Sequence, residues 1–84
     1  MIVGGHDIQD GCIILEPRDV FDRGVVGYDA DENRLIYSYR LLIDAMCECW
    51  GLSWSDALDW IAYNTERSLA YMQNPPILKD DISE

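Results

Sequence analysis

The sequence predicts an α+β fold, in which a small antiparallel β-sheet packs against two or three α-helices. Two β-prone runs, residues 24–28 and 34–39, flank a stretch of turn-forming residues. From Tyr39 onward the apolar residues change to the three- and four-residue spacing of a helix. The chain has 84 residues, and 49% of them are hydrophobic, which is enough for one compact core. We therefore expect residues 1–84 to form a single domain.

The N-terminal part carries the weakest pattern. Residues 1–11 contain three glycines and no clear period, so we expect a loose N-terminal arm or a short edge strand. Residues 12–15 form a short apolar run, which predicts a short strand that ends before Pro17. Charged residues surround two apolar ones in residues 18–24, and this pattern is compatible with one helical turn.

The clearest local signal is a β-hairpin over about residues 24–39. β-branched and aromatic residues lie on both sides of Asp29-Ala30-Asp31-Glu32-Asn33. Turn-prone residues between two such runs predict a hairpin with a loop of about five residues.

Two helices are expected after the hairpin. The first begins at Tyr39 and ends before Gly51, a residue type that suits the left-handed position after a helix. Ser53 and Asp56 resemble a capping box, so the second helix should begin there. The apolar stripe of the first helix is Leu42, Ala45, Met46 and Cys49.

The second helical pattern runs through Asn64-Thr65, with or without a bend, to Met72. Asn74-Pro75-Pro76 ends it, because a residue before proline disfavours the helical conformation. Residues 77–78 can add a last strand, and residues 79–84 are expected to form a flexible acidic tail.

The charge balance restricts the partners of this protein. Sixteen Asp and Glu residues face six Lys and Arg residues, so the net charge at pH 7 is −10. Such a field repels nucleic acid and anionic membranes and attracts basic protein surfaces. No apolar run approaches the roughly 18 residues that a membrane span needs. We expect no direct binding of nucleic acid and no membrane insertion.

Cysteine usage indicates a reducing compartment. The three cysteines are an odd number, and Cys47 and Cys49 are too close together for an ordinary disulfide. No signal peptide is recognisable at the N-terminus. A soluble protein with reduced thiols, located in the cytoplasm, is therefore expected.

An EF-hand calcium site is not expected. Asp29, Asp31 and Asn33 open like a calcium-binding loop. The pattern then fails, because Arg34 and Arg40 occupy the positions that need glycine and a bidentate glutamate. A solvated hairpin loop is the favoured interpretation.

Zinc binding and catalysis are not expected either. Cys47 and Cys49, with His6 and Cys12, invite a zinc interpretation, but a one-residue gap on a helix splays two thiols by about 200°. His6 is the only histidine, and no serine or cysteine has the sequence context of an activated nucleophile. The sequence predicts no metal, no cofactor and no catalytic residue, and therefore no enzyme.

Several short motifs follow one another along the chain: Glu16-Pro17, Phe21-Asp22, Val25-Val26-Gly27, Arg34-Leu35-Ile36-Tyr37-Ser38-Tyr39, Asp59-Trp60, Asn64-Thr65, Tyr71-Met72 and Pro76-Ile77. In this succession residues 12–78 resemble a group of short proteins encoded by bacteriophages and prophages. The motifs resemble turns and core positions, and the group has no established activity, so no functional residue is carried over. The resemblance implies a phage accessory gene whose product acts in the cytoplasm of the bacterial host.

Acidic side chains cluster at the hairpin loop and on both helices, while Trp60 and Tyr63 point away from the apolar stripe of the second helix. Tryptophan and tyrosine often anchor protein interfaces. The predicted partner-binding residues are Asp29, Asp31, Glu32, Asp44, Glu48, Asp56, Asp59, Trp60 and Tyr63. We expect a non-enzymatic phage anti-defence inhibitor, with an anti-CRISPR protein as the leading candidate. As a DNA mimic it would bind the basic nucleic-acid-binding surface of a host nuclease complex and block DNA access.

The alternative function is a small structural or regulatory phage protein that works through homo-oligomerisation. Its acidity would then serve only solubility, and a homodimer would bury Trp60 and Tyr63. Another element of the same fold could equally cover these aromatic side chains. A small enzyme would require a pocket that gathers His6 with carboxylates of shifted pKa.

Overall fold

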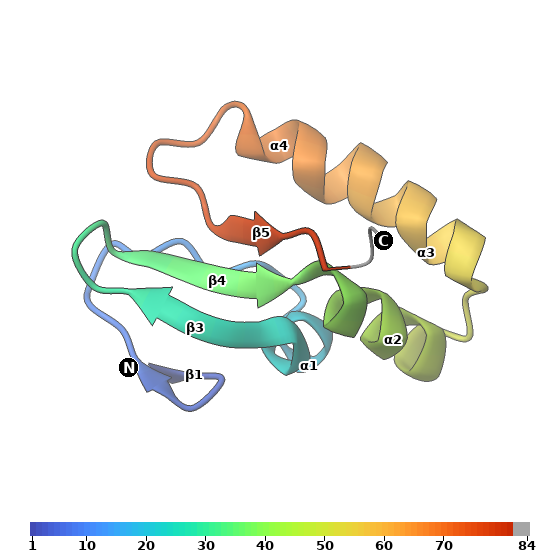
Figure 1. Ribbon diagram of the computed structural model, residues 1–84, viewed down its shortest axis with the longest axis horizontal. Coiled ribbons are helices and arrows are strands. Elements are labelled where there is room, and N and C mark those ends of the chain that lie inside the picture. The colour runs from blue at the N-terminus through green and yellow to red at the C-terminus, as the bar shows by residue number, and fades with distance from the viewer. Residues whose placement is uncertain (82–84) are drawn as a thin grey trace.

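The computed structural model describes residues 1–81, which fold as a three-stranded sheet packed against helices, with a separate two-stranded hairpin at the N-terminus (Figure 1). The strands are β1 Ile2–Val3, β2 His6–Asp7, β3 Val25–Asp29, β4 Arg34–Ser38 and β5 Ile77–Lys79. The helical segments are α1 Arg18–Phe21, the 3-10 turn η1 Asp22–Gly24, α2 Tyr39–Trp50, α3 Trp54–Trp60, the π-helical segment η2 Ile61–Glu66 and α4 Arg67–Leu69. The predicted α+β fold is confirmed.

The larger sheet has the strand order β3-β4-β5. β3 and β4 form the predicted antiparallel hairpin, in which Val25 lies opposite Tyr37 and Asp29 lies opposite Arg34. β5 confirms the last expected strand, but it runs parallel to β4. A parallel neighbour needs a crossover connection, and the helical layer from α2 to α4 supplies it.

The strand predicted near residues 12–15 is wrong. Residues 12–15 pair with neither outer strand of the larger sheet, whose order is β3-β4-β5. The segment instead crosses to the hydroxyl of Tyr37, which accepts the backbone N–H of Leu15 at 3.0 Å. Its apolar character reflects burial, because the side chain of Leu15 belongs to the core.

The N-terminal arm, predicted to be loose or a short edge strand, folds as the hairpin β1–β2. Val3 and Ile8 are both buried in the core. Gly4 has φ +56°, and a Cβ at this position would lie 2.5 Å from the Cβ of Val25. A larger residue there would push the hairpin away from the start of β3, so glycine is required by both conformation and space.

The predicted acidic tail over residues 79–84 falls partly outside the described residues. Lys79 belongs to β5, and Asp81 accepts hydrogen bonds from the Ser38 hydroxyl and from the backbone N–H of Arg40. These bonds, the Ser38 one first, hold the pKa of the Asp81 carboxyl below its usual value. Asp81 therefore supports the first turn of α2.

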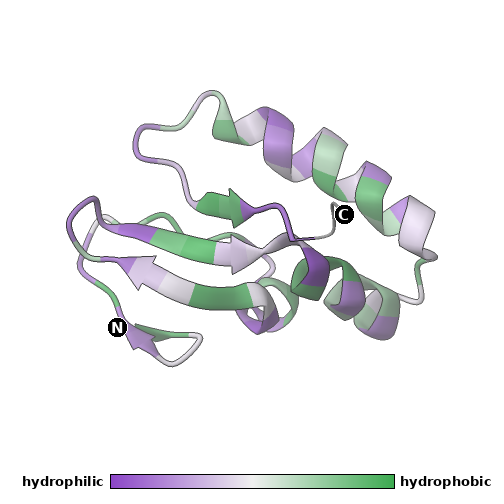
Figure 2. Ribbon diagram, viewed as in Figure 1, coloured by the Kyte–Doolittle hydropathy of each residue, from purple (hydrophilic) through white to green (hydrophobic). Residues whose placement is uncertain are grey.

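The first main helix begins and ends where the sequence predicts, and the second begins where predicted but ends at Leu69, before the expected Met72. Ser38 caps α2 by accepting the N–H of Leu41 at 3.1 Å, and Gly51 closes that helix at φ +67°. Ser53 caps α3 by accepting the N–H of Asp56 at 3.1 Å. In Figure 2 these helices alternate between hydrophobic and hydrophilic residues, as expected for helices with one buried face.

The core lies between the larger sheet and the helices. Its largest fully buried side chains come from α1, β4, α2 and η2: Phe21, Leu35, Tyr37, Leu42, Ile43, Met46 and Ile61. The ring of Tyr37 meets that of Phe21 edge to face, with ring centres 6.4 Å apart. This contact joins the central strand to α1.

Replacing Tyr37 by phenylalanine is predicted to lower the free energy of unfolding by about 1–3 kcal/mol, because the buried N–H of Leu15 would lose its acceptor. Urea denaturation followed by circular dichroism measures this change. Tyr71→Phe is the matched control, since Tyr71 is 91% exposed and its variant should be as stable as the natural protein. Equal losses of unfolding free energy in the two variants would contradict the stabilising role of the Tyr37 hydroxyl.

Stability is also predicted to fall in alkali. Burial raises the pKa of Tyr37 from 10 to about 12, against a smaller opposing effect of the Leu15 hydrogen bond. A folded-state pKa above the unfolded value means that the stabilisation is complete below pH 10 and is lost as pH rises towards 12. Burial likewise raises the pKa of Tyr39 to about 12. Urea midpoints measured at stepwise higher pH should decline over this window, and a flat profile would refute the prediction.

Candidate functional site

The predicted acidic residues fall into two groups at opposite ends of a molecule 35 Å long (Figure 1). Asp29, Asp31 and Glu32 lie in or beside the loop between β3 and β4, and the others lie on α2 and α3. The predicted acidic residues therefore do not form one compact cluster.

The hairpin-loop carboxylates mostly serve the loop itself. Asp29 accepts the backbone N–H groups of Asp31 and Glu32 at 3.0 and 3.2 Å, which holds the turn. Glu32 forms an ion pair with Arg34 at 2.8 Å. Two of the three carboxylates thus have a partner within the hairpin.

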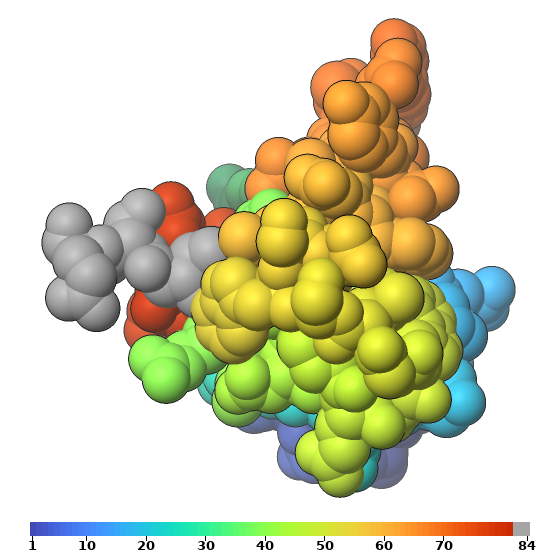
Figure 3. All heavy atoms as spheres, turned by 90° about the vertical axis from the view of Figure 1, so that its right-hand side faces the viewer, coloured from blue at the N-terminus to red at the C-terminus, as the bar shows by residue number. Residues whose placement is uncertain are grey.

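The second group lies at the end of the molecule formed by α2 and α3, which Figure 3 shows face on. Asp44 and Glu48 are exposed on α2, one turn apart, and Asp56 and Asp59 are exposed on α3. Glu48 lies 3.5 Å from Arg23, in an exposed ion pair. We call the three remaining carboxylates, Asp44, Asp56 and Asp59, the acidic end.

The two predicted aromatic anchors have different environments. Trp60 is half-buried, because its ring contacts Phe21 and Trp50 with ring centres 5.9 and 5.0 Å away. The open alternative that other elements cover the aromatics therefore holds for Trp60. Tyr63 is 68% exposed and follows Asp56 and Asp59 at helical spacing on the outer side of α3 and η2.

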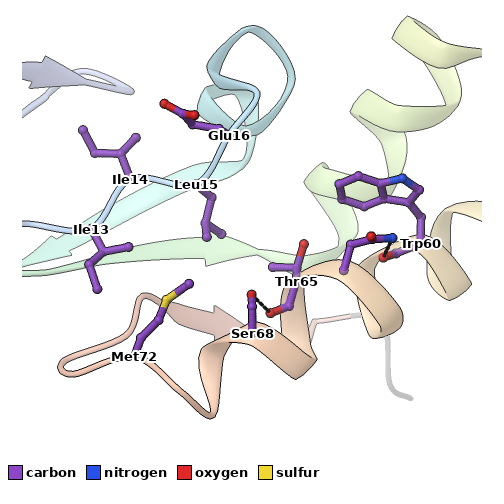
Figure 4. A pocket seen from close by; sticks show the side chains of 9 residues that line it. Ile13, Ile14, Leu15, Glu16, Trp60, Thr65, Ser68 and Met72 are labelled. Carbon is purple, nitrogen blue, oxygen red and sulfur yellow. Dashed lines mark hydrogen bonds between the residues drawn. The ribbon is translucent and has the colours of Figure 1, made fainter.

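A cavity of about 270 Å³ lies between residues 13–16 and the helical segment that follows Trp60 (Figure 4). Nine residues from these two stretches line it: Ile13, Ile14, Leu15, Glu16, Trp60, Asn64, Thr65, Ser68 and Met72. Apolar side chains form most of the wall, and the amide and hydroxyl groups all come from the helix. No local sequence pattern predicts this cavity, because its two walls are far apart along the chain.

The helical wall of this cavity contains the π-helical segment η2. A π turn bonds each N–H to the carbonyl five residues back, which widens the helix locally, and such turns are frequent at functional sites. The side-chain amide of Asn64 donates to the carbonyl of Trp60 at 3.0 Å, and the Ser68 hydroxyl donates to the carbonyl of Thr65 at 2.8 Å. The bend left open at Asn64-Thr65 was the one sequence signal for this feature.

The cavity lining is suited to binding more than to covalent chemistry. It offers two hydroxyls, one amide and one carboxylate, and no histidine, cysteine or lysine of residues 1–81 lines it. His6 lies in β2, and burial raises the pKa of the Cys12 thiol, which keeps it protonated at neutral pH.

The described residues hold neither a metal-binding cluster nor a membrane-spanning helix. Within residues 1–81 no group of three or more His, Cys, Asp or Glu side chains is arranged to hold a metal ion, and the three cysteines are free thiols. In the same range, no helix combines the length and the apolar character needed to span a bilayer.

Alanine substitutions should show that Trp60 stabilises the fold and that Tyr63 does not. Trp60→Ala is predicted to lower the free energy of unfolding by about 2–3 kcal/mol, because it removes the contacts with Phe21 and Trp50. Tyr63→Ala should change it by less than about 0.5 kcal/mol, since that side chain is exposed. Thermal or urea denaturation of the two variants measures both values. A large loss for Tyr63→Ala would mean that this side chain supports the fold and is not available to a partner.

Comparison of the chain with family models, with curated proteins and with solved structures found no match in any of the three. The resemblance to short phage proteins therefore stays a prediction from the sequence. The candidate sites are defined by the geometry of this chain alone: the acidic end with Tyr63, and the cavity beside η2.

Proposed function

We propose that this protein is a non-enzymatic inhibitor that docks its acidic end on a basic protein surface. The observation that carries the proposal is that three carboxylates without a partner in the described part of the chain lie on α2 and α3, together with the exposed Tyr63 just after α3. Among residues 1–81, the side chains of Asp44, Asp56 and Asp59 make no ion pair and no hydrogen bond. They lack the hydrogen bonds by which Asp29, Asp22 and Asp81 support the fold, and only Asp56 has a local role, as an acidic residue in the first turn of α3.

The charge of the whole molecule supports the same partner. A net charge of −10 on 84 residues creates a long-range field that accelerates encounter with cationic surfaces. Exposed charges of this kind act mainly on the association rate and are screened at high salt. Tyr63, next to Asp59 on the outer side of the helix, supplies an aromatic anchor of the type that gives an interface its affinity.

The basic surface that we propose as the target is the nucleic-acid-binding surface of a nuclease complex in the bacterial host. Such surfaces are built to hold rows of phosphate charges, and carboxylates can take the place of those phosphates. The phage resemblance supports an anti-defence role in the host cytoplasm, with an anti-CRISPR protein as the leading candidate. In this proposal the DNA mimicry is confined to the α2–α3 end, because Asp29 and Glu32 of the hairpin loop already have partners within the hairpin.

A second candidate function is self-association through exposed aromatics. Tyr71 is 91% exposed, Tyr63 68% and Trp54 43%, all in or just after the helical stretch from α3 to α4. Large exposed apolar groups often mark interfaces. The two candidates differ in salt dependence: two copies of an anionic chain repel each other, so salt should favour the dimer, whereas salt should weaken docking on a basic partner. Sedimentation of the pure protein at low and high salt distinguishes them.

Neutralising the acidic end should abolish docking. The triple variant Asp44→Asn, Asp56→Asn and Asp59→Asn removes three charges, from −10 to −7. It is expected to keep the fold, because all three side chains are exposed, and circular dichroism checks this. Immobilised natural protein is expected to capture a nucleic-acid-binding protein from a phage-host lysate at about 50 mM salt and to release it at about 500 mM. The triple variant should capture none of it, as judged by mass spectrometry of the bound fraction.

The matched control carries the same charge change elsewhere. Asp10→Asn, Asp19→Asn and Asp31→Asn alter three exposed carboxylates outside the acidic end, so this variant should keep most of the captured partner. Equal loss in the two variants would show that net charge alone matters. A partner that stays bound at high salt would contradict the electrostatic mechanism.

A further inference from the structure

The hydroxyl of Thr65 is the least explained polar group of the cavity. The residue is only 4% exposed and belongs to the cavity wall. No hydrogen bond within residues 1–81 uses this hydroxyl, yet no fully buried side-chain oxygen or nitrogen of those residues lacks a partner. The Thr65 hydroxyl has no partner among these residues, so it cannot be fully buried. It keeps access to the cavity, into which it points in Figure 4. A polar group held in such a place favours an occupant that can bond to it.

The dimensions and walls of the cavity restrict the occupant. A volume of about 270 Å³ lies just below the usual range for small-molecule pockets, so one or two side chains fit better than a drug-sized ligand. Ile13, Leu15 and Met72 offer an apolar wall for a methylene chain. The indole of Trp60 lies at the opposite end from Ile13 and Met72 (Figure 4).

The polar character of the cavity favours a hydrogen-bond donor with positive charge. Glu16, at the rim with its carboxylate turned outward in Figure 4, is the one charged residue of the lining. The Ser68 hydroxyl donates its one hydrogen to the carbonyl of Thr65, so it still offers lone pairs. Asn64 uses one of its two amide N–H groups on the carbonyl of Trp60, and its side-chain oxygen remains an acceptor. An indole face attracts cations as well. An anionic occupant would find no cation in the lining and would be repelled by a molecule of charge −10.

We infer that the cavity receives an arginine side chain of the basic partner, with its methylene chain on Ile13, Leu15 and Met72 and its guanidinium against Trp60 and the Thr65 hydroxyl. The inference rests on the proposed function, since that function makes the partner basic. Arginine suits this cavity better than lysine, because its planar guanidinium stacks on aromatic rings, is weakly hydrated and carries five donors. The cavity thereby adds a specific anchor to the less specific attraction of the acidic end.

The test uses three blocked hexapeptides that differ at one central residue: arginine, its uncharged isostere citrulline, and norleucine. Each is titrated at about 50 mM salt into the full chain labelled with ¹⁵N, and amide and indole resonances are followed by NMR. The arginine peptide should shift the amides of Thr65 and Ser68 and the indole N–H of Trp60 in a saturable manner. It should bind at least about threefold more tightly than the citrulline peptide, the size expected for a cation on an indole face. The norleucine peptide should bind most weakly.

Thr65→Val removes the hydroxyl and is expected to weaken binding of the arginine peptide by about threefold or more. Ser55→Ala is the matched control, because it removes an exposed hydroxyl of the adjoining α3, outside the cavity, and should leave the affinity unchanged. If Thr65→Val does not fold, the comparison of arginine with citrulline on the natural chain still decides the matter.

Several outcomes would overturn the inference. Equal affinity for arginine and citrulline would remove the role of charge, and no saturable shift with any peptide would mean that the cavity is not a side-chain site. Shifts confined to Asp56, Asp59 and Tyr63 would place arginine on the acidic end instead. In each of these cases the proposed function stands or falls separately, by the lysate capture with the acidic-end variant.

Discussion

The structure depends on the buried side chain of Tyr37 at the centre of the middle strand. Its hydroxyl accepts the N–H of Leu15, and its ring packs edge to face on Phe21, so one residue joins β4, α1 and the segment before α1. That segment forms one wall of the cavity. The hydrogen bond between Leu15 and Tyr37 therefore helps to set the shape of the cavity, because a shift of the Leu15 backbone would change the distance between the two cavity walls.

The sixteen carboxylates of the chain serve different purposes in the folded protein. Some complete local structure: Asp29 holds the hairpin turn, Asp22 pairs with Arg18, and Asp81 binds the first turn of α2. Other carboxylates are exposed to solvent and form no hydrogen bond or ion pair within residues 1–81; these are Asp44, Asp56 and Asp59 at the acidic end. Composition alone cannot distinguish the two classes, since a carboxylate that bonds an N–H and one that attracts a partner have the same sequence signature. Only the second class supports the proposed docking.

The helical stretch after Ser53 combines both candidate sites. Its outer side presents Asp56, Asp59 and Tyr63, while Trp60 and the polar residues of η2 and α4 line the cavity. The π turn links the two, because the extra residue in that turn changes which side chains face inward after Trp60. A basic partner that used both sites would therefore contact two sides of this helical stretch, with the carboxylates on the outer side and the cavity on the side that faces residues 13–16.

Elements with local signals could be predicted from residue type and spacing. The hairpin loop at residues 29–33, the cap at Ser53 and the helix end at Gly51 each depend on neighbours within a few residues, so residue type and spacing were sufficient. Tertiary structure alone decided that residues 12–15 are not a strand, that β5 is parallel and that a cavity lies beside η2. These features depend on which strands pair with β4 and on segments that lie about fifty residues apart and meet across the core. Local patterns carry no information about such pairings. An apolar run such as residues 12–15 can be buried either as a strand of a sheet or as an irregular segment bonded to the hydroxyl of Tyr37.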